Sequence, residues 1–469
     1  MTDQPVNSDI ELDRHRRYHF VGVGGIGMSA LASILLGRGF TVSGSDSQGS
    51  SILERLTAEG AQIAVGHAAE NVHAGDIVVL SDAIKPDNPE WLRANELGLT
   101  IIKRADVLAA VTNAGRGLAV SGTHGKTTTS GMLTMILLEA TANPTCVLGG
   151  EMTALQGNAR NGGDLTVVEA CEAYNSFIQL YPEAAIVTNI EVDHLDFHMT
   201  AENLYGSFRR FLRQVRSFAV INGDDPVLRT MTGLAPRCVT YGAGEVNDYR
   251  FTEVSLAGGS TFTLTKDGEK LGVIELIVPG LHNVSNATAA AALAFELGIE
   301  FKYIQAGLAK FPGMKRRFER LGTINGVAII DDYAHHPTEI SAMLAAARNA
   351  FSGKIVVIFQ PHLYSRTRDL LHEFTQALAG ADLVVLVPIY AAREKPMDGI
   401  SHESLAESID SDVHVITLYD KDSIVSIFRS AFSREILGPV PYLQEGDAII
   451  FVGAGDINQV GIALVAVNS

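Results

Sequence analysis

The sequence predicts a three-domain α/β protein built on mainly parallel sheets, and three observations support this. At 469 residues the chain is long enough for about three domains. Its hydrophobic content of 46%, with many glycines and few aromatic residues, is typical of packed α/β cores. Short apolar runs alternate with helical stretches through three successive blocks, as in βαβ units. Because ligands of parallel sheets bind beyond the carboxyl ends of the strands, the chemistry should lie in loops that follow strands.

Composition and charge exclude several functions. The formal net charge of −17 argues against binding to nucleic acids or to membrane surfaces. No run approaches the ~18–20 apolar residues of a membrane span, and residues 1–17 do not resemble a signal peptide. Cys146, Cys171 and Cys238 have neither zinc-type spacing nor the density of a disulfide scaffold, so we expect reduced thiols in a cytoplasmic protein. The sequence does not predict the oligomeric state.

The first block, residues 1–112, carries a glycine motif between a strand and a helix. Its apolar runs predict strands at 18–21, 40–42 and 77–80, and a helix at 28–36. Gly22, Gly24 and Gly27 form G-x-G-x-x-G after the first strand, and Asp46 follows the second. The motif indicates a diphosphate at a helix N-terminus, so an NAD-dependent dehydrogenase, with Asp46 on the ribose, and a UDP-linked substrate fit equally well. Close packing of the helix on the strand is a third, purely structural explanation.

The second block, residues 113–320, contains the most informative stretch of the chain. Residues 121–129 read Ser-Gly-Thr-His-Gly-Lys-Thr-Thr-Thr directly after the apolar run 118–120. A buried strand, a glycine turn, a lysine and hydroxyls that open a helix form a phosphate cradle, in which Lys126 adds positive charge and Thr127 can bind Mg²⁺. Position 120 is Val rather than the Gly of the strict P-loop pattern, which points away from GTPases and kinases toward a narrower group of ATP users. The sequence therefore predicts ATP binding.

Acidic and imidazole side chains follow two further strands of this block. They are Glu169, Glu172, Asn189, Glu191, Asp193, His194, Asp196 and His198. Groups just past strand ends can hold Mg²⁺ against phosphate oxygens, and Glu172 and His194 are the better ligand candidates. Asp193 and Asp196 are equally well explained as helix caps or solvated loop charges. No H-E-x-x-H motif is present, so a zinc protease is excluded.

The remaining elements complete the three blocks. The second block should contain a linker at 113–117, strands at 165–168 and 185–188, a strand-like region at 249–278 and a helix at 283–296. The third, residues 321–469, should contain strands at 327–330, 354–359, 383–387, 413–416 and 448–452.

Polar stretches of the second and third blocks indicate further binding sites. In residues 280–286, Asn283 can read a nucleobase edge or cap the helix that begins there, and the sequence favours neither. An arginine within 314–318 could reach a transferring phosphate. Residues 331–337 and 360–368 place basic and imidazole groups at helix starts, which suggests recognition of carboxylates.

Four motifs together resemble the Mur ligases over nearly the whole chain. They are Gly-Val-Gly-Gly-Ile-Gly-Met-Ser at 22–29, Gly-Thr-His-Gly-Lys-Thr-Thr at 122–128, Asp-Asp-Tyr-Ala-His-His-Pro-Thr-Glu at 331–339 and Gln-Pro-His-Leu-Tyr-Ser-Arg-Thr at 360–367. The last is similar to the branch that adds L-alanine rather than to the branch that recycles murein tripeptide. The resemblance implies ATP-dependent ligation of L-alanine to UDP-N-acetylmuramate for peptidoglycan synthesis. The first domain would then bind the UDP-linked substrate, the central one ATP, and the third the amino acid.

The resemblance also implies roles residue by residue. ATP is expected at Gly122, Thr123, His124, Gly125, Lys126, Thr127, Thr128, His282, Asn283, Asn286, Arg317 and Asp332. The UDP-linked substrate is expected at Gly22, Gly24, Gly25, Gly27, Met28, Ser45, Asp46, His67 and Ser81. The amino acid is expected at Tyr333, His362 and Arg366, and Mg²⁺ at Thr127, Glu172 and His194. The expected catalytic residues are Lys126, Glu172, His194 and Arg317.

This chain departs from the Mur ligase pattern at two places. The acidic motif reads Glu-Ala-Cys-Glu-Ala-Tyr at 169–174, where many Mur ligases end in Glu-Ser-Asp, so the roles of Ala173 and Tyr174 are open. Several Mur ligases also carry a carbamylated lysine in the central domain, but no lysine lies between Lys126 and Lys266. Two other functions stay open on the sequence: an NAD-dependent oxidoreductase, and a non-catalytic regulatory protein that binds ATP.

Overall fold

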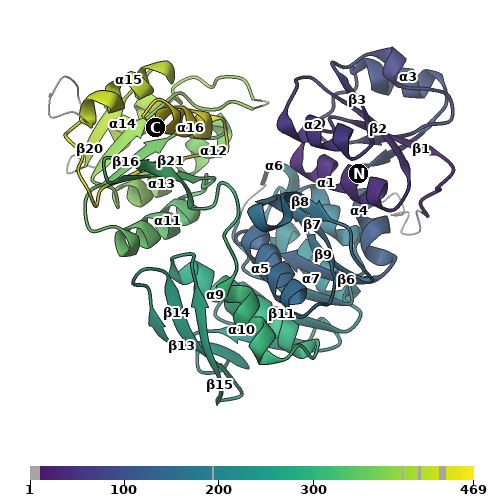
Figure 1. The fold of residues 1–469 in the computed structure, drawn as a ribbon, viewed down its shortest axis with the longest axis horizontal. Coiled ribbons are helices and arrows are strands. Elements are labelled where there is room, and N and C mark those ends of the chain that lie inside the picture. The colour runs from purple at the N-terminus through teal and green to yellow at the C-terminus, as the bar shows by residue number, and fades with distance from the viewer. Residues whose placement is uncertain (1–10, 193–194, 393, 410–412, 433–439, 469) are drawn as a thin grey trace. The chain divides into compact units, whose positions relative to one another are not determined.

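Three β-sheets organise the chain in the computed structural model (Figure 1). The structure describes residues 11–192, 195–392, 394–409, 413–432 and 440–468. The chain forms two compact units: one comprises residues 1–252, 263–274 and 285–311, and the other residues 253–262, 275–284 and 312–469. The first unit contains the first sheet and most of the second sheet, and the second unit contains the third sheet.

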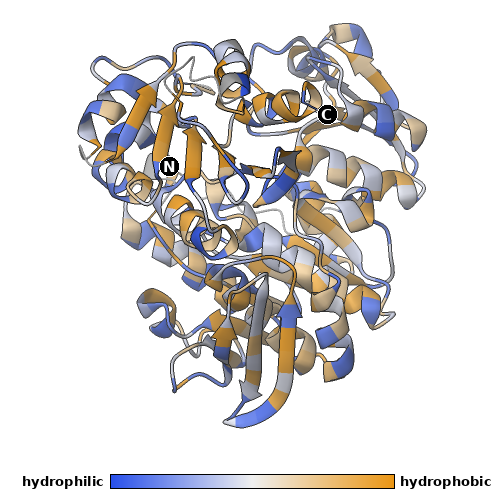
Figure 2. Ribbon diagram, turned by 60° about the vertical axis from the view of Figure 1, so that its left-hand side comes forward, coloured by the Kyte–Doolittle hydropathy of each residue, from blue (hydrophilic) through white to orange (hydrophobic). Residues whose placement is uncertain are grey.

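The first sheet is parallel throughout, in the order β3-β2-β1-β4-β5. Its strands are β1 (Arg17–Val21), β2 (Thr41–Asp46), β3 (Gln62–Val65), β4 (Ile77–Leu80) and β5 (Thr100–Lys103). Its helices are α1 (Ile26–Gly37), α2 (Ser51–Ala58), η1 (Ala69–Asn71), α3 (Pro89–Glu96) and α4 (Arg104–Asn113). Strands β1 and β4 are almost entirely buried, and β4 consists only of hydrophobic residues; Figure 2 shows the hydropathy of the described residues. Strand order reverses between β1 and β4, so their carboxyl ends form the expected ligand crevice.

The second sheet is mixed, in the order β15-β14-β13-β12-β11-β10-β6-β9-β7-β8. Its strands are β6 (Arg116–Ser121), β7 (Thr145–Met152), β8 (Gly157–Arg160), β9 (Leu165–Glu169), β10 (Ala184–Val187), β11 (Phe218–Asn222), β12 (Cys238–Gly242), β13 (Tyr249–Ser255), β14 (Ser260–Lys266) and β15 (Glu269–Leu276). The helices of this region are α5 (Lys126–Glu139), η2 (Thr153–Leu155), η3 (Ala173–Gln179), α6 (Leu195–His198), α7 (Ala201–Gln214), α8 (Pro226–Arg229), α9 (Leu281–Glu296) and α10 (Phe301–Ala309). The central strands β9, β6, β10, β11 and β12 pair in parallel, whereas β7 and β8 are antiparallel.

The third sheet has the order β16-β17-β21-β18-β19-β20, and β16 is antiparallel to β17. Its strands are β16 (Glu319–Ile324), β17 (Val327–Asp332), β18 (Ile355–Phe359), β19 (Leu383–Leu386), β20 (His414–Thr417) and β21 (Ala448–Val452). Its helices are α11 (Pro337–Ala350), α12 (Tyr364–Asp369), α13 (Leu371–Leu378), α14 (His402–Ser408), α15 (Asp422–Ala431) and α16 (Ile457–Ala466). The core strands β17, β18, β19 and β21 are completely buried, as their continuous apolar runs predict.

Two predicted limits fall inside regular elements. Strand β6 begins at Arg116, so the connection after α4 is shorter than the predicted linker at 113–117. Residue 320, the predicted end of the second block, lies inside β16. This strand escapes sequence analysis because it is only partly buried and has no continuous apolar run. The three-domain limits themselves stay a prediction.

Side-chain hydrogen bonds connect the first two sheets within the first unit. Helix α1 packs against β7 and β8. Asn158, which is 1% exposed, donates from Nδ2 to the carbonyl oxygen of Ile26 at 2.6 Å and accepts at Oδ1 from Arg55 at 3.2 Å. Arg55 also pairs with Glu151 at 3.2 Å. The first turn of α1 is therefore anchored to the second sheet.

Two sequence expectations concern membrane-spanning segments and the state of the cysteine thiols. In the described part of the chain, no helix combines the length and apolar character needed to cross a membrane. Cys146, Cys171 and Cys238 are all free thiols, and burial raises the pKa of the Cys146 thiol to about 11.

Candidate active site

The phosphate loop has the predicted strand–turn–helix arrangement. Strand β6 ends at Ser121 and α5 begins at Lys126, so residues 122–125 form the turn. Gly125 caps α5 with φ +81°, a left-handed conformation that favours glycine. A Cβ at this position would also lie 2.5 Å from Oδ1 of Asn286. Both backbone and space therefore require glycine here, and Asn286 of α9 lies directly against the loop.

Residues that follow β10 hold the loop in shape. Asn189 accepts at Oδ1 from the His124 N–H at 2.8 Å and donates from Nδ2 to the His124 carbonyl at 3.1 Å. Thr188 Oγ1 donates to the same carbonyl at 2.6 Å, and the Glu191 carboxylate lies 3.2 Å from His124 Nε2. The sequence predicts Asn189 and Glu191 among the groups around an ion. In the structure both bind the loop, because β10 ends beside β6.

Lys126 and Thr127 each contact a carboxylate. Lys126 Nζ lies 3.0 Å from Glu172 Oε2 and donates to the carbonyl oxygens of Gly122 and Thr123. Thr127 Oγ1 donates to Glu169 Oε2 at 2.6 Å. Burial opposes the charge on Lys126, but Glu172 and the neighbouring acidic groups outweigh it and raise the pKa of the ammonium. Two carboxylates, a hydroxyl and a permanent cation thus gather at the end of β9 and the start of α5.

The donor set at this position fits Mg²⁺. Glu169, Glu172 and Thr127 offer hard oxygen ligands, and the last two are 2% and 8% exposed. His198 is also buried, and its Nε2 lies 3.2 Å from the Glu172 carbonyl, which joins α6 to this segment. Asp193, His194 and the side chain of Asp196 lie outside the described residues. Ala173 begins the short helix η3 directly after Glu172.

The residues expected on the adenine side lie in the first two turns of α9. The helix begins at Leu281, so Asn283 is inside its first turn and the capping interpretation is wrong. Asn283 Nδ2 instead donates to the Pro279 carbonyl at 2.7 Å. His282 is exposed and lies beside Gly280.

The three residues expected to bind the amino acid lie together after β17 and β18, within the second unit. Arg366 Nη1 is 3.3 Å from His362 Nδ1. The His362 ring lies 5.9 Å from the His335 ring, which in turn lies 5.4 Å from the Tyr333 ring. His335 therefore connects the predicted residues; the sequence places it among the imidazole groups of 331–337 but not among the named amino-acid-binding residues. Its position in Tyr-Ala-His-His was the available signal.

Arg317 and Asp332 lie on the same side of this sheet. The Arg317 guanidinium is 5.2 Å from the Tyr333 ring centre and its Nη1 is 3.6 Å from Glu339. Asp332 is 7% exposed and accepts from the N–H groups of Phe318 at 2.8 Å and Ala334 at 2.7 Å. Burial raises the pKa of Asp332 to about 6, against the opposing influence of Arg317 and the two amides. Asp332 thus fixes the turn that carries Tyr333.

The expected UDP-substrate residues gather at the carboxyl ends of the first sheet. The Gly24 N–H donates to Asp46 Oδ2 at 2.9 Å, and a Cβ at Gly24 would lie 2.8 Å from that oxygen. A Cβ at Gly27 would lie 3.2 Å from the Arg104 side chain, so close side-chain approach explains both glycines. Ser45 Oγ is 2.9 Å from His67 Nδ1.

The position of Met28 differs from the sequence prediction, and Glu90 is a residue that the sequence analysis did not name. The Met28 side chain is 2% exposed in the hydrophobic core, so it does not face the crevice with the other residues. Glu90 was missed, yet its buried carboxylate accepts a hydrogen bond from Ser45. The sequence signal was Asn88-Pro89-Glu90, a helix start that places a carboxylate in the first turn.

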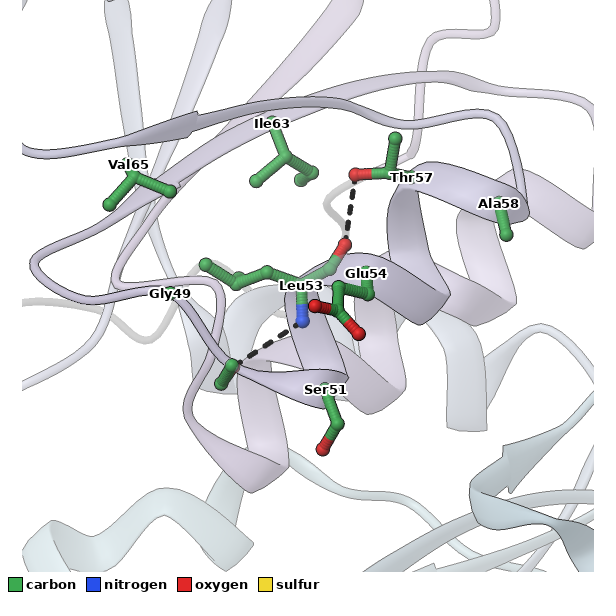
Figure 3. A pocket seen from close by; sticks show the side chains of 9 residues that line it. Gly49, Ser51, Leu53, Glu54, Thr57, Ala58, Ile63 and Val65 are labelled. Atoms are coloured by element: carbon green, nitrogen blue, oxygen red, sulfur yellow. Dashed lines mark hydrogen bonds between the residues drawn. The ribbon is translucent and has the colours of Figure 1, made fainter.

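A hollow of about 660 Å³ lies between α2 and β3 (Figure 3). Leu53, Ile63 and Val65 give it an apolar wall, and Glu54 and Thr57 line it as well. None of its lining residues belongs to the predicted UDP-substrate set. Leu53 borders both this hollow and the predicted UDP-substrate residues, because its Cδ2 would lie 3.6 Å from a Cβ at Gly24.

Comparison with known families covers all three sheets. Residues 17–116 match the Mur ligase family catalytic domain, residues 120–294 the Mur ligase middle domain and residues 316–455 the Mur ligase glutamate ligase domain. The chain belongs to the Mur ligase family. The fold is accordingly the α/β Mur ligase fold, with one parallel and two mixed sheets.

Individual Mur ligases match along the whole chain. The UDP-N-acetylmuramate–L-alanine ligase of Desulforamulus reducens is 41% identical over 96% of this chain and 98% of its own length. The UDP-N-acetylmuramate–alanine ligase structure from Thermotoga maritima is 30% identical, with a TM-score of 0.82 over 96% of this chain and 99% of that chain. A murein peptide ligase structure from Psychrobacter arcticus, 24% identical, has a TM-score of 0.71 over 96% of this chain and 98% of that chain, and shares the fold.

Proposed function

We propose that this protein joins L-alanine to the carboxylate of UDP-N-acetylmuramate, converting ATP to ADP and phosphate, in peptidoglycan precursor synthesis. The observation that carries the proposal is the full-length similarity, at 41% identity, to a ligase of that name. The cluster of Lys126, Thr127, Glu169 and Glu172 supports it, because the cluster combines a phosphate loop with oxygen ligands for Mg²⁺.

The reaction needs ATP because a carboxylate resists attack by an amine. Transfer of the γ-phosphoryl group to the carboxylate gives an acyl phosphate and ADP. The L-alanine amine then attacks the acyl carbon, loses a proton, and expels inorganic phosphate as the amide forms. Such catalysis consists mainly of positioning and of neutralising charge on the transferring group.

Residues of the first unit are proposed to bind the phosphates of ATP. The Lys126 ammonium stays charged beside Glu172 and can neutralise phosphate oxygens. The amides of residues 122–125 and the N-terminus of α5 would bind the phosphates. Mg²⁺, when bound by Thr127, Glu172 and His194, would supply further positive charge at the phosphates. Asn286, in the first unit, and Asn283, in the second, are proposed for the adenine side.

Residues of the second unit are proposed to bind L-alanine. Arg366 offers a guanidinium for the L-alanine carboxylate, and His362 and Tyr333 lie close by. Arg317 is proposed to contact the γ-phosphate and Asp332 the nucleotide edge. The proposed domains are residues 1–112 for the UDP-linked substrate, 113–320 for ATP and 321–469 for the amino acid. The free thiols agree with a cytoplasmic reaction.

Phosphate release tests the proposal. Purified protein is incubated with ATP and Mg²⁺, with UDP-N-acetylmuramate and L-alanine present singly and together, and the nucleotide product is identified by mass. Release that requires both substrates, with a product heavier by one alanyl residue, is the expected result. A murein-peptide ligase would prefer a tripeptide, an oxidoreductase would change nicotinamide absorbance, and a regulatory protein would bind nucleotides without turnover. Any of these outcomes would overturn the proposal.

A further inference from the structure

Glu90 is a charged side chain in the interior of the first domain. It stands in the first turn of α3, and its side chain is 0% exposed. A buried carboxylate is destabilising unless hydrogen bonds compensate for the loss of water. The polar groups around Glu90 come from β1, β2 and the segment after β3.

Polar groups surround both oxygens of the Glu90 carboxylate. Oε1 accepts from Asn71 Nδ2 at 2.5 Å and from the Ala68 N–H at 3.3 Å. Oε2 accepts from Ser45 Oγ at 2.5 Å and lies 3.3 Å from His67 Nδ1. His19 Nε2 lies 3.6 Å from the same oxygen. Burial opposes ionisation, but interactions with His19, Ser45 and Asn71 outweigh it and lower the pKa of Glu90 to about 2.

The order of donors and acceptors fixes the tautomer of His67. An ionised carboxylate only accepts hydrogen bonds, so the single proton of the Ser45 hydroxyl is donated to Glu90. Ser45 Oγ, 2.9 Å from His67 Nδ1, can then only accept from this nitrogen. His67 must therefore carry its proton on Nδ1 when it is neutral, which leaves a lone pair on Nε2. Within the described parts of the chain, Nε2 has no hydrogen-bond partner, and the side chain is 21% exposed.

The segment that carries His67 lies at the same end of β2 as the glycine loop. The neighbouring Gly66 N–H donates to the Asp46 carbonyl at 2.7 Å, and Asp46 binds the Gly24 N–H through its carboxylate. The Ser45 carbonyl accepts from the N–H groups of Gly22 and Val23. The His67 segment and the glycine loop are therefore attached to the same end of β2.

We propose that Glu90 is a positioning residue of the UDP-substrate site: through Ser45 it fixes the tautomer in which His67 Nε2 accepts a hydrogen bond from an N–H or O–H group of the uridine part. This inference rests on the proposed function. Uridine offers two sources of such a donor, the N3–H of uracil and the hydroxyls of the ribose. A cytosine ring has no N3–H, so the uracil source would also discriminate between pyrimidines.

Glu90→Gln tests the inference with almost no change of shape. The Gln carbonyl would keep the bonds from Asn71 and Ala68, so its NH₂ group would face Ser45 and His67. His67 Nδ1 must then accept, and the proton moves to Nε2, which turns the acceptor into a donor. The dissociation constant for UDP-N-acetylmuramate, measured by calorimetry, should rise about 10-fold or more, because a buried donor would face a donor. The KM values for ATP and L-alanine should stay unchanged.

Glu96→Gln is the matched control, since Glu96 lies on the same helix with its side chain 68% exposed. Nitrogen-15 NMR at pH 8.5, where an imidazole is neutral, should show His67 Nε2 unprotonated in the wild type and protonated in Glu90→Gln. UDP analogues that lack the N3–H or the 2′-hydroxyl identify the donor, because only the analogue that lacks it should lose affinity.

The outcomes separate this inference from the proposed function. Absence of turnover by the wild-type protein would contradict the proposed function, whereas the tautomer and the dissociation constants judge Glu90. An Nε2-protonated His67 in the wild type, or an unchanged dissociation constant in Glu90→Gln, would overturn the inference. Should Glu90→Gln fail to fold, the wild-type NMR measurement and His67→Ala, at a partly exposed position, decide the question. Unchanged binding by His67→Ala would also overturn it.

Discussion

Lys126 Nζ lies 3.0 Å from Glu172 Oε2, with the two side chains 11% and 2% exposed. A buried ion pair of this kind stabilises the fold little, but loss of one partner leaves the other charge uncompensated. The pair also brings the phosphate-loop cation and a proposed metal ligand to the same place. Its two roles, folding and catalysis, can be separated by substitution.

Lys126→Ala should lower kcat by about 10²-fold or more, because the ammonium acts mainly on charge in the transition state. The variant should also lose stability, since Glu172 would remain buried without its cation. The double variant Lys126→Met, Glu172→Gln removes both charges and should recover stability without activity. Thermal unfolding and steady-state kinetics measure the two effects. Lys302→Ala, at a 62% exposed side chain, is the control, and near-normal kcat in Lys126→Ala would show that the loop is structural.

Removing a ligand of the proposed Mg²⁺ site should raise the metal requirement. Glu172→Ala, Thr127→Ala and His194→Ala are each expected to increase the Mg²⁺ concentration for half-maximal activity about 10-fold or more. Magnesium titration of turnover at saturating ATP is the measurement. Glu183→Ala, which removes a surface partner of Arg116, should leave the titration unchanged. A variant that titrates like the wild type does not bind the metal.

Arg366→Ala should impair the use of L-alanine while nucleotide binding is retained. The guanidinium can hold the amino-acid carboxylate as a charge-assisted pair, so its loss should raise the KM for L-alanine about 10- to 100-fold. Arg368→Ala is the matched control, because Arg368 lies on the same helix, is 53% exposed and pairs with Asp369. Collapse of nucleotide binding with an unchanged KM for L-alanine would place Arg366 at the phosphates instead.

Activity should not depend on bicarbonate or CO₂. Helix α7, which comes after α6, offers Arg209, Arg210 and Arg213 rather than lysine. A guanidinium stays protonated and cannot form a carbamate. Turnover in degassed buffer, with and without bicarbonate, should be equal, and the intact mass should show no carbamate. Loss of activity on degassing that bicarbonate restores would contradict the prediction.

The sequence predicts those features of the fold and the site that depend on residues close together along the chain. Continuous apolar runs identified the buried strands β17, β18 and β21, and the stretch from Ser121 to Thr129 predicted the phosphate loop. The edge strand β16 was missed because its alternation is weak and its burial partial. Local sequence patterns are sufficient to predict elements whose contacts join residues only a few positions apart.

Long-range contacts could not be predicted in the same way. The bond between Asn189 and His124 joins residues 65 positions apart, and the bond between Glu90 and Ser45 joins residues 45 apart. Met28 follows the glycine motif in sequence, but helix geometry turns its side chain into the core. Only the strand order shows which polar residues can reach a ligand and which ones hold a neighbouring loop in place.

The hydrogen bond from Asn158 to the Ile26 carbonyl has a practical consequence for ligand discovery. A fragment that ends at Asn113 would contain every residue of the glycine loop, yet it would lack both Asn158 and Glu151. Its Arg55 would keep only the ion pair with Glu59, and the first turn of α1 would lose its anchor. Screening of compounds against such a fragment would measure a loosened diphosphate cradle. A chain that keeps both partners in place must also retain β9, because β7 and β8 join the second sheet through this strand.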